Sequence, residues 1–505
     1  MKLPVVSCAE MRRIEERTFA GGATAENLME EVGRQIAQAV LQSVPRRGVA
    51  AVYYGRGNNG GDALVAARYL TMAGWGIELH PQEKDTSKLS ELTGRNLAAL
   101  HSTKLLSRGG GPDFDARVAV ILDGLLGIGA AGPLREDVRA LAREINARRA
   151  EGNARVFAID LPTGLNGDTG EADPDCVVAD VTVTAGYAKS GLVADGAAAY
   201  VGRLCVAALP AFEAHAPGEE APGETATPES LRGLLPRRNF ESYKTQYGRV
   251  GIVAGSPGFT GAAVLCANGA LRAGAGLVTI YAPEDIQPVL AVAAPPEVMV
   301  RPVKSYEEVL EEKHDVLAVG PGLGHGRAGA ILQLIEHPQG AMVLDADGLN
   351  IVARHDPPLL EHCAGPRLLT PHPGEMERLF PEAKDLSRYE TATRFTTRHS
   401  SSRFPITLLL KGSRTIVLEH RKPASYNTTG NPGMGTGGMG DVLTGVCAAL
   451  IGQHLSPYDA ARLGAWLCGR AAEMAVVVRG EESLAAMDIP QWLGAAFGQL
   501  RRGGL

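Results

Sequence analysis

Apolar runs that stop at a glycine-rich or acidic turn recur along this chain, and each is followed by an amphipathic helical pattern. Examples are "VAVILDGLLG", "RVFAIDLPTG", "RVGIVAGS" and "AMVLDADG". Such alternation is typical of strand and helix units whose parallel strands share one sheet. The chain is therefore predicted to have an α/β fold. Because parallel sheets bind ligands beyond the carboxyl ends of their strands, polar residues at those ends are the first functional candidates.

A break in composition divides the alternating pattern into two parts. Residues 213–229, "EAHAPGEEAPGETATPE", hold five glutamates and several prolines, and no lysine, arginine, large aliphatic or aromatic residue. A segment of this kind cannot bury a core and is predicted to be an extended linker. A chain of 505 residues exceeds one ordinary core. We therefore expect one domain over residues 1–212 and a second over residues 230–505.

Composition and charge exclude several classes of protein. Hydrophobic residues make up 45% of the chain and charged residues 21%, as in globular proteins, and 62 glycines fit many tight strand-to-helix turns. The formal charge of −6 gives no electrostatic reason to expect nucleic acid or an anionic membrane as a partner. Seven scattered cysteines without a CxxC motif fit a reducing compartment. With no signal-peptide pattern and no long apolar run, a cytoplasmic location is expected.

The stretch "GRGNNGGDALVAARYL" raises the question of ordinary dinucleotide binding, because it has the spacing G-x-G-x-x-G between a strand and a helix pattern. The same stretch places Asp62 at the expected helix start, where a carboxylate can cap free N–H groups but would repel a pyrophosphate. Asn58, Asn59 and Asp62 instead offer oxygens that suit a hard cation or the hydroxyls of a polar ligand. The pattern thus favours a different site over simple dinucleotide binding.

Acidic residues end two further strands of the first domain, Asp123 in "LDGLLG" and Asp160 in "IDLPTG". Carboxylates that share a cleft repel one another, so a bound cation or a raised pKa is expected there. Asn59, Asp123 and Thr163 can offer oxygen ligands to a metal ion, which leaves Asp160 as a candidate general acid or base. Alternatively, both aspartates only cap turns. The following loop, Gly127 to Pro133, adds backbone N–H groups that suit a phosphate or a ribose.

These motifs, "GRGNNGGDALVAARYL", "LDGLLGIGAAGPL" and "AIDLPTGLNGDTG", resemble the NAD(P)H-hydrate epimerase family over about residues 10–210. The resemblance implies a Rossmann-like three-layer α/β domain, catalysis by Asp160, and potassium held by Asn59, Asp123 and Thr163. Lys189 in "YAKSGL" matches a lysine that often precedes Pro-Gly in the family; because the proline is missing here, its role stays open, and the alternative is a surface lysine. The implied substrate contacts are Asn58, Asn59, Gly60, Gly61, Asp62, Gly127, Ile128, Gly129, Ala130, Ala131, Gly132 and Pro133.

The second domain ends in "YNTTGNPGMGTGGMGDVLTGVCAALIG". Its glycines and the helix that follows would surround an anion with backbone N–H groups, and Asp441 lies beside them. A transferring phosphoryl group needs such donors, and its acceptor hydroxyl needs a carboxylate to take the proton. His372, held between two prolines, is predicted to contact a ligand. Asp345 and Asp347 receive no catalytic role, because they could be buried turn carboxylates.

Together with "VGPGLG", "VLDADGLN", "LTPHPGE" and "YKTQYGRVGIVAGSPGFTGAAVL", this segment resembles the NAD(P)H-hydrate dehydratase family over about residues 235–500. The resemblance implies a ribokinase-like α/β domain that consumes ADP with Mg²⁺, and Asp441 as the catalytic base. The hydrate would lie near Ala262, Gly322 and His372. The implied nucleotide contacts are Lys411, Gly412, Ser413, Arg414, Thr415 and Gly440.

The two resemblances complement each other, because a dehydratase that acts on one epimer of hydrated NADH or NADPH needs an epimerase for the other. The prediction is a repair enzyme for both hydrates, with small-molecule substrates and a homo-oligomeric state. Two alternatives stay open. The second domain could be a ribokinase-like kinase of a small hydroxyl compound, or the first could be a binding module without catalytic activity.

Overall fold

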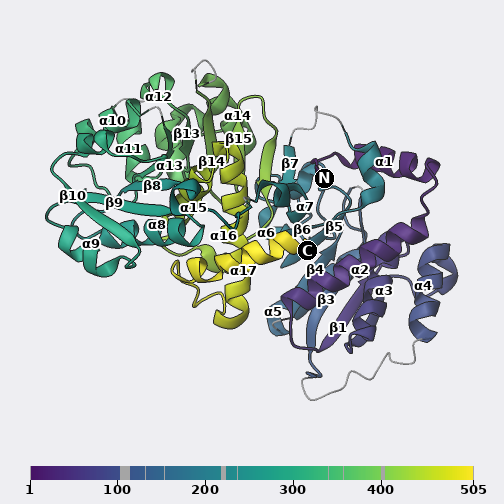
Figure 1. Cartoon of the computed structure of the whole chain (residues 1–505). Helices are drawn as coiled ribbons and strands as arrows, with labels where there is room; N and C mark the ends of the chain where they lie inside the picture. The colour runs from purple at the N-terminus through teal and green to yellow at the C-terminus, as the bar shows by residue number, and fades with distance from the viewer. Residues whose placement is uncertain are drawn as a thin grey trace. The chain divides into compact units, whose positions relative to one another are not determined.

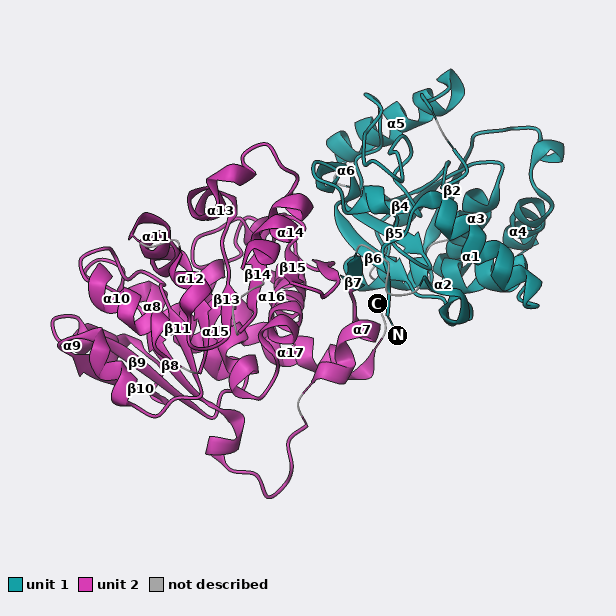
Figure 2. Cartoon of the chain, turned by 90° about the horizontal axis from the view of Figure 1, so that it is seen from above, with its two compact units in different colours: residues 1–225, 505 teal, residues 226–504 magenta. Residues whose placement is uncertain are grey.

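The computed structural model divides the chain into unit 1, Met1–Thr225, and unit 2, Ala226–Gly504 (Figure 2). The division falls inside the segment expected as a linker. That segment is not a wholly solvated linker, because a 3-10 helix covers Pro210–His215 and Gly223–Ala226 form the buried strand β7; pairing between backbones needs no large side chain. The structure describes residues 2–102, 114–130, 132–152, 154–217, 223–235, 237–338, 340–355, 358–399 and 404–503.

Unit 1 alternates strands and helices as the sequence predicts (Figure 1). Its helices are α1 (Cys8–Ala20), α2 (Ala25–Ser43), α3 (Asn58–Met72), α4 (Glu91–Ser102), α5 (Glu136–Gly152) and α6 (Ala198–Val201). Its strands are β1 (Val49–Tyr54), β2 (Gly76–Pro81), β3 (Val118–Gly124), β4 (Arg155–Ile159), β5 (Val181–Ala185) and β6 (Arg203–Ala207).

The sheet of unit 1 has the order β2-β1-β3-β4-β5-β6, and its paired strands are parallel. Successive side chains of a strand face opposite sides. Ala50 and Val52 therefore join the core beneath α1 to α4, whereas Ala51 and Tyr53 join the core beneath α5. The strand order reverses between β1 and β3, and a crevice at such a point is where doubly wound sheets bind ligands.

Unit 2 repeats the alternation on a larger scale (Figure 1). Its helices are α7 (Pro228–Leu231), α8 (Thr260–Arg272), α9 (Gln287–Ala293), α10 (Ala328–Glu336), α11 (Ala346–His355), α12 (Leu359–His362), α13 (Pro373–Leu379), α14 (Arg388–Arg398), α15 (Met439–Gly452), α16 (Pro457–Arg479) and α17 (Asp488–Arg502). Its strands are β8 (Arg249–Val253), β9 (Leu277–Pro283), β10 (Val298–Val303), β11 (Val316–Val319), β12 (Ala341–Leu344), β13 (Arg367–Leu369), β14 (Ile406–Leu410), β15 (Ile416–Glu419) and β16 (Ala424–Asn427).

The second sheet has the order β10-β9-β8-β11-β12-β13-β14-β15-β16-β7. Strands β8 to β14 pair in parallel, and β15 and β16 return antiparallel. Helices α8, α15, α16 and α17 bury one face in a large apolar core, and α10, α11 and α14 pack on the other side (Figure 2). The order reverses between β8 and β11, which predicts the ligand site of this unit as well.

Helices α8 and α15 approach each other closely where glycine leaves room for backbone. A Cβ atom on Gly445 would lie 1.9 Å from the carbonyl oxygen of Cys266. All seven cysteines are buried, as their apolar contexts predict. No helix in the part of the chain that the structure describes is long and apolar enough to cross a bilayer.

We expect Gly445→Ala to lower the urea midpoint of unit 2, with a loss of about 1–3 kcal/mol, because the added methyl group must push two packed helices apart. The matched control is Gly329→Ala, since a Cβ atom on that exposed glycine of α10 meets nothing within 4 Å. The control is expected to be neutral or to stabilise by up to about 1 kcal/mol. Equal midpoints for the two variants would contradict this account of the α8–α15 contact.

Candidate active sites

A pocket of about 910 Å³ opens in unit 1 at the ends of β1, β3 and β4, where the strand order reverses. Most of the substrate contacts predicted in this unit line it, and Ala131 lies outside the described residues. Gly60 and Gly61 are buried behind the lining, where a Cβ atom would lie 2.1 Å from the Gly55 oxygen or 2.6 Å from Met29. The predicted residues that line the pocket are Asn58, Asn59, Asp62, Gly127, Ile128, Gly129, Ala130, Gly132, Pro133 and Asp160.

Lys189 forms a buried ion pair with Asp160, so its interpretation as a surface lysine is wrong. Only 1% of the lysine side chain is exposed. Its ammonium group donates to one Asp160 carboxylate oxygen, to Thr184 Oγ1 at 2.9 Å and to the Ala185 carbonyl oxygen at 3.0 Å. Its distance along the chain from "DLPTG" hid this contact, which β5 creates by pairing beside β4.

The second oxygen of Asp160 faces the glycine loop. Asp160 Oδ2 accepts from the Ile128 N–H at 3.4 Å, and a Cβ atom on Gly127 would lie 3.3 Å from it. Asp160 itself has a φ of 65°, a strained conformation for a residue with a side chain. One oxygen is thus held by a buried cation while the other is presented to the pocket.

The three predicted metal ligands converge on one network. Asp123, fully buried, accepts from the Thr163 N–H at 2.8 Å and the Thr163 hydroxyl at 2.7 Å. Thr163 Oγ1 accepts from the Leu126 N–H at 3.3 Å, and Asn59 Nδ2 donates to the Leu126 oxygen at 2.9 Å. Burial raises the pKa of Asp123 to about 6, because the donors around it do not fully replace water. Asp123 therefore caps its turn, as the alternative interpretation holds, and also joins Asn59 and Thr163.

Asp62 lies one turn inside α3, which begins at Asn58, so it does not cap the first free N–H groups as expected. Burial raises the pKa of Asp62 well above its usual value, and the nearby Asp160 and Glu15 carboxylates raise it further. Glu15 and Arg12 come from α1 and also line the pocket. Arg12 and Glu15 belong to no motif in the sequence, because only the tertiary fold brings α1 to this edge of the sheet.

The glycine-rich segment of unit 2 forms the predicted turn and helix. Gly438, with a φ of 88°, precedes α15, and Asp441 occupies the first helical turn. Burial raises the pKa of Asp441 to about 7, and the Asp345 carboxylate contributes to that rise. An aspartate with this pKa can accept a proton near neutral pH. The structure thus places the glycine turn, the start of α15 and Asp441 next to one another; the anion hole itself stays a prediction.

Asp345 anchors a charged cluster beside Asp441. Lys411 lies with its ammonium nitrogen 2.7 Å from Asp345 and 3.9 Å from Glu375, and Thr444 donates to Asp345 at 2.8 Å. Lys411 lowers the pKa of Asp345 although that carboxyl is buried. A Cβ atom on Gly440 would lie 3.1 Å from the Lys411 nitrogen, so the glycine allows this close approach. Asp345 is a buried carboxylate that positions a lysine.

His372 caps α13 rather than simply occupying a turn. Its Nδ1 accepts from the N–H groups of Gly374 and Glu375 at 3.1 and 3.3 Å. A neutral ring with this acceptor carries its proton on Nε2, and half of the side chain is exposed. Its Nε2 lies 3.4 Å from Glu375 Oε1, and a contact between His372 and a ligand stays a prediction.

The remaining predicted residues of unit 2 divide between exposed and buried positions. A Cβ atom on Gly322 would lie 2.9 Å from the Ala262 side chain, so these two residues adjoin as predicted. Gly412 and Ser413 are exposed, whereas Arg414 is buried. Arg388 fixes the 411–415 turn by donating to the carbonyl oxygens of Leu410, Lys411 and Arg414. Within the described ranges, no group of three His, Cys, Asp or Glu side chains could hold a metal ion.

Curated relatives align over nearly the whole chain. A bifunctional NAD(P)H-hydrate repair enzyme of Moorella thermoacetica is 36% identical over 92% of this chain and 91% of its own. The enzyme of that name from Escherichia coli is 34% identical over 93% and 88%. A solved structure of the ADP/ATP-dependent NAD(P)H-hydrate dehydratase from Bacillus subtilis, co-crystallised with ATP and Mg²⁺, is 28% identical, covers 54% of this chain and 97% of that one, and has a TM-score of 0.48.

The fold and the two sites define a class of two-domain α/β enzymes that joins a Rossmann-like unit to a ribokinase-like unit. Residues 25–191 match the family model described as YjeF-related protein N-terminus, and residues 250–492 match that of NAD(P)H-hydrate dehydratase. The chain belongs to the family of bifunctional NAD(P)H-hydrate repair enzymes.

Proposed function

We propose that unit 1 interconverts the R and S epimers of NADH and NADPH hydrates and that unit 2 dehydrates the S epimer at the expense of ADP. The observation that carries this proposal is the presence, in one chain, of two glycine-lined sites with a carboxylate placed for proton transfer in each. Asp160 faces the pocket of unit 1, and Asp441 begins the helix behind the glycine loop of unit 2.

In unit 1, Asp160 acts as the proton acceptor for the C6 hydroxyl of the hydrate. As that proton leaves, the C6–N1 bond breaks to give an aldehyde and N1 takes a proton; closure on the other face of the aldehyde inverts C6. Asp62 is the proton donor in this scheme, because burial raises the pKa of its carboxyl well above the usual value and the group lines the pocket. Lys189 does not touch the substrate in this scheme; it positions Asp160 through the buried ion pair.

In unit 2, Asp441 takes the proton of the C6 hydroxyl, whose oxygen attacks the terminal phosphorus of ADP. The bond from that phosphorus to AMP breaks, and a phosphate ester forms at C6. Phosphate then leaves with the C6–O electron pair, N1 supplies its lone pair, and loss of a proton from C5 restores the dihydropyridine ring. Backbone N–H groups after Gly438 and the Lys411 ammonium stabilise the developing phosphoryl charge. Mg²⁺ would arrive with ADP and neutralise its phosphates.

Potassium suits the network around Asp123, because Asn59, Asp123 and Thr163 each carry a side-chain oxygen, and the partners of the Asp123 carboxylate among the described residues are N–H and O–H groups and not a cation. Asn59, Asp123 and Thr163 would hold the ion. A bound cation there would supply positive charge beneath the loop that Asn59 and Leu126 join.

The first experiment follows NADH absorbance after the protein meets an R and S mixture of NADH hydrate with K⁺, Mg²⁺ and either ADP or ATP. The wild type is expected to recover the whole mixture with a nucleotide. Asp160→Asn should recover the S fraction plus slow spontaneous conversion, with the epimerase rate down about 100-fold or more, and Asp441→Asn should recover none. No recovery with either nucleotide would overturn the proposal. A stable phosphorylated product from a small hydroxyl compound would then favour the kinase.

Lys189→Met is expected to lower kcat of epimerisation by about 10-fold or more with little change in KM, because Lys189 acts through Asp160. The double variant Asp160→Asn/Lys189→Met should be no slower than Asp160→Asn alone, since one functional unit is already lost. It also serves as the folding control, because both buried charges are removed together. Independent, multiplicative losses would contradict the positioning role.

Potassium is expected to raise the thermal midpoint of unit 1 more than sodium does, because an ion that binds only the folded state stabilises it by about 2.7 kcal/mol at 100 times its Kd. Differential scanning calorimetry measures the thermal midpoint in K⁺ and in Na⁺. The difference between the two midpoints is compared for the wild type, Asp123→Asn and Thr163→Val. The variants should lose the difference. A difference that survives in both variants would place the ion elsewhere.

The pH dependence of dehydration tests the base in unit 2. Because Asp441 must be deprotonated and its pKa is about 7, kcat/KM for the S hydrate is expected to rise with pH through this value. Asp345→Asn removes an anion that raises this pKa and should move the rising limb to lower pH by about one unit. Asp347→Asn removes a weaker contributor and should move it less. If kcat/KM of Asp345→Asn rises over the same pH range as in the wild type, Asp345 does not raise the pKa of Asp441.

A further inference from the structure

The pocket of unit 1 extends well beyond Asp160 and ends in a part that the proposed chemistry leaves unexplained. Along the sheet, Asp160 follows β4, the glycine loop follows β3, and Asn58 and Asn59 follow β1. The lining then continues to residues after β2, at the edge of the sheet. Those residues are Gln82, Lys88, Leu89 and Ser90.

A hydrate whose ring reaches Asp160 must place its adenosine half toward β2, because most of the lining lies on that side. The pyrophosphate, which both hydrates share, then falls at the loop from Gly127 to Pro133 with its free N–H groups. Arg135 lines the pocket beside that loop. The adenosine ribose reaches the residues after β2, where dinucleotide folds select between a 2′-hydroxyl and a 2′-phosphate.

The structure assigns to this end of the pocket a phosphate subsite, formed by Arg56 and Lys88, that takes the 2′-phosphate of the NADPH hydrate. The assignment rests on the proposed epimerase function of unit 1. It predicts that the hydrate of NADPH is epimerised in preference to that of NADH.

Two loops are tied together so that the two cations share one rim. The Ser90 N–H donates to the Arg56 carbonyl oxygen at 2.9 Å. Thr93 Oγ1 donates to the Gly57 carbonyl oxygen at 2.9 Å and accepts from the Ser90 hydroxyl at 2.8 Å. Arg56 follows β1 and Lys88 lies two residues before Ser90, and both line the pocket. Their backbones are thus held while their side chains reach into solvent-accessible space.

In dinucleotide-binding folds an acidic residue near the end of the second strand binds a free 2′-hydroxyl. Here the acidic residue of that strand, Glu78, does not line the pocket. It is held by Arg148 at 2.9 Å and His80 at 2.7 Å. The lining residue that follows β2 is the neutral Gln82, whose amide donates to Asp137 at 3.0 Å. Lys88 pairs with Glu83 at 3.1 Å, and 55% of the lysine side chain is exposed. A phosphomonoester with two negative charges can compete with this partner for so exposed a lysine.

The test measures kcat/KM for epimerisation of the R hydrates of NADPH and NADH by the full chain. The wild type is expected to favour the NADPH hydrate. Arg56→Gln and Lys88→Gln should each lower kcat/KM for the NADPH hydrate about 10-fold and leave the NADH hydrate within about 2-fold, since a hydrogen bond to a charged group is lost for one substrate only. The double variant should lose the preference.

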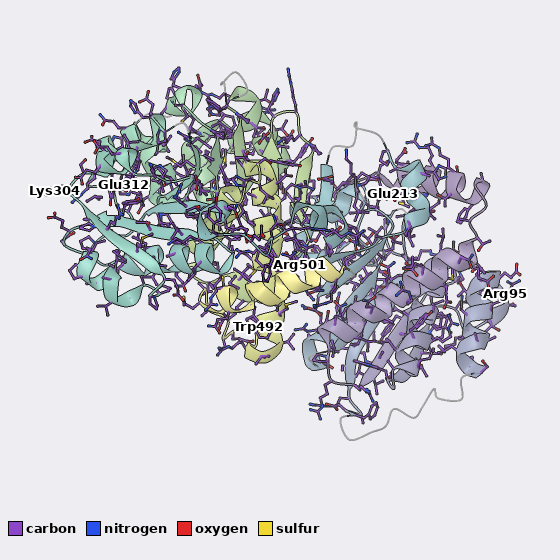
Figure 3. The ribbon with its side chains drawn as sticks, viewed as in Figure 1. Arg95, Glu213, Lys304, Glu312, Trp492 and Arg501 are labelled. Atoms are coloured by element: carbon purple, nitrogen blue, oxygen red, sulfur yellow. The ribbon has the colours of Figure 1, made fainter. Side chains whose placement is uncertain are left out.

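The matched control is Arg95→Gln, an exposed cation at the outer face of α4 that does not line the pocket (Figure 3). It should change neither rate. Equal losses of kcat/KM for both hydrates would show that the cations hold the shared pyrophosphate, and this would overturn the subsite. Variants that keep the wild-type ratio of the two kcat/KM values would overturn it as well. A wild type that epimerises neither hydrate would instead overturn the proposed function itself.

Discussion

Each unit of this protein places a buried lysine against the carboxylate that ends a parallel strand, and the geometry of both sites depends on that ion pair. Lys189 holds Asp160 in unit 1, and Lys411 holds Asp345 in unit 2. A buried charge without a partner is strongly unfavourable, so each pair constrains the loops around it to positions that keep the charges together. The consequence differs between the units. In unit 1 the paired carboxylate itself faces the pocket, whereas in unit 2 the paired carboxylate lies behind Asp441 and raises its pKa.

The two units have similar sites because each parallel sheet has a point where the strand order reverses. Where the strand order reverses, neighbouring connections leave in opposite directions and a crevice forms at the carboxyl ends. Glycines then let backbone come close: Gly60 adjoins Gly55 in unit 1, and Gly440 adjoins Lys411 in unit 2. Such close approaches leave N–H groups free to meet anionic parts of a ligand. The two proposed steps, proton exchange at C6 in one unit and phosphoryl transfer in the other, would depend on the side chains around the carboxylates rather than on the fold.

The order of steps also explains why family members join these activities in one chain. Epimerisation alone leaves the hydrate damaged, and a dehydratase restricted to the S epimer leaves the R epimer unrepaired. Two independently folded cores allow each carboxylate to have its own environment: Asp123 and Asp62 surround one site, and Asp345 and Glu375 surround the other. A single crevice would have to combine these carboxylates and the conflicting pKa shifts that they cause.

The sequence by itself determined the α/β class, the division into two parts, the strand-end residues Asp123 and Asp160, and the helix start that carries Asp441. Strand periodicity and glycine spacing are local properties of a chain. It also singled out Thr163, which bonds to Asp123; the potassium site of Asn59, Asp123 and Thr163 stays a prediction. Only the tertiary structure decided the roles that depend on distant segments. Lys189 looked like a surface residue until β5 brought it to Asp160, and Arg12 and Glu15 of α1 carried no motif at all. Burial and long-range pairing set these roles, and neither is written in the order of neighbouring residues.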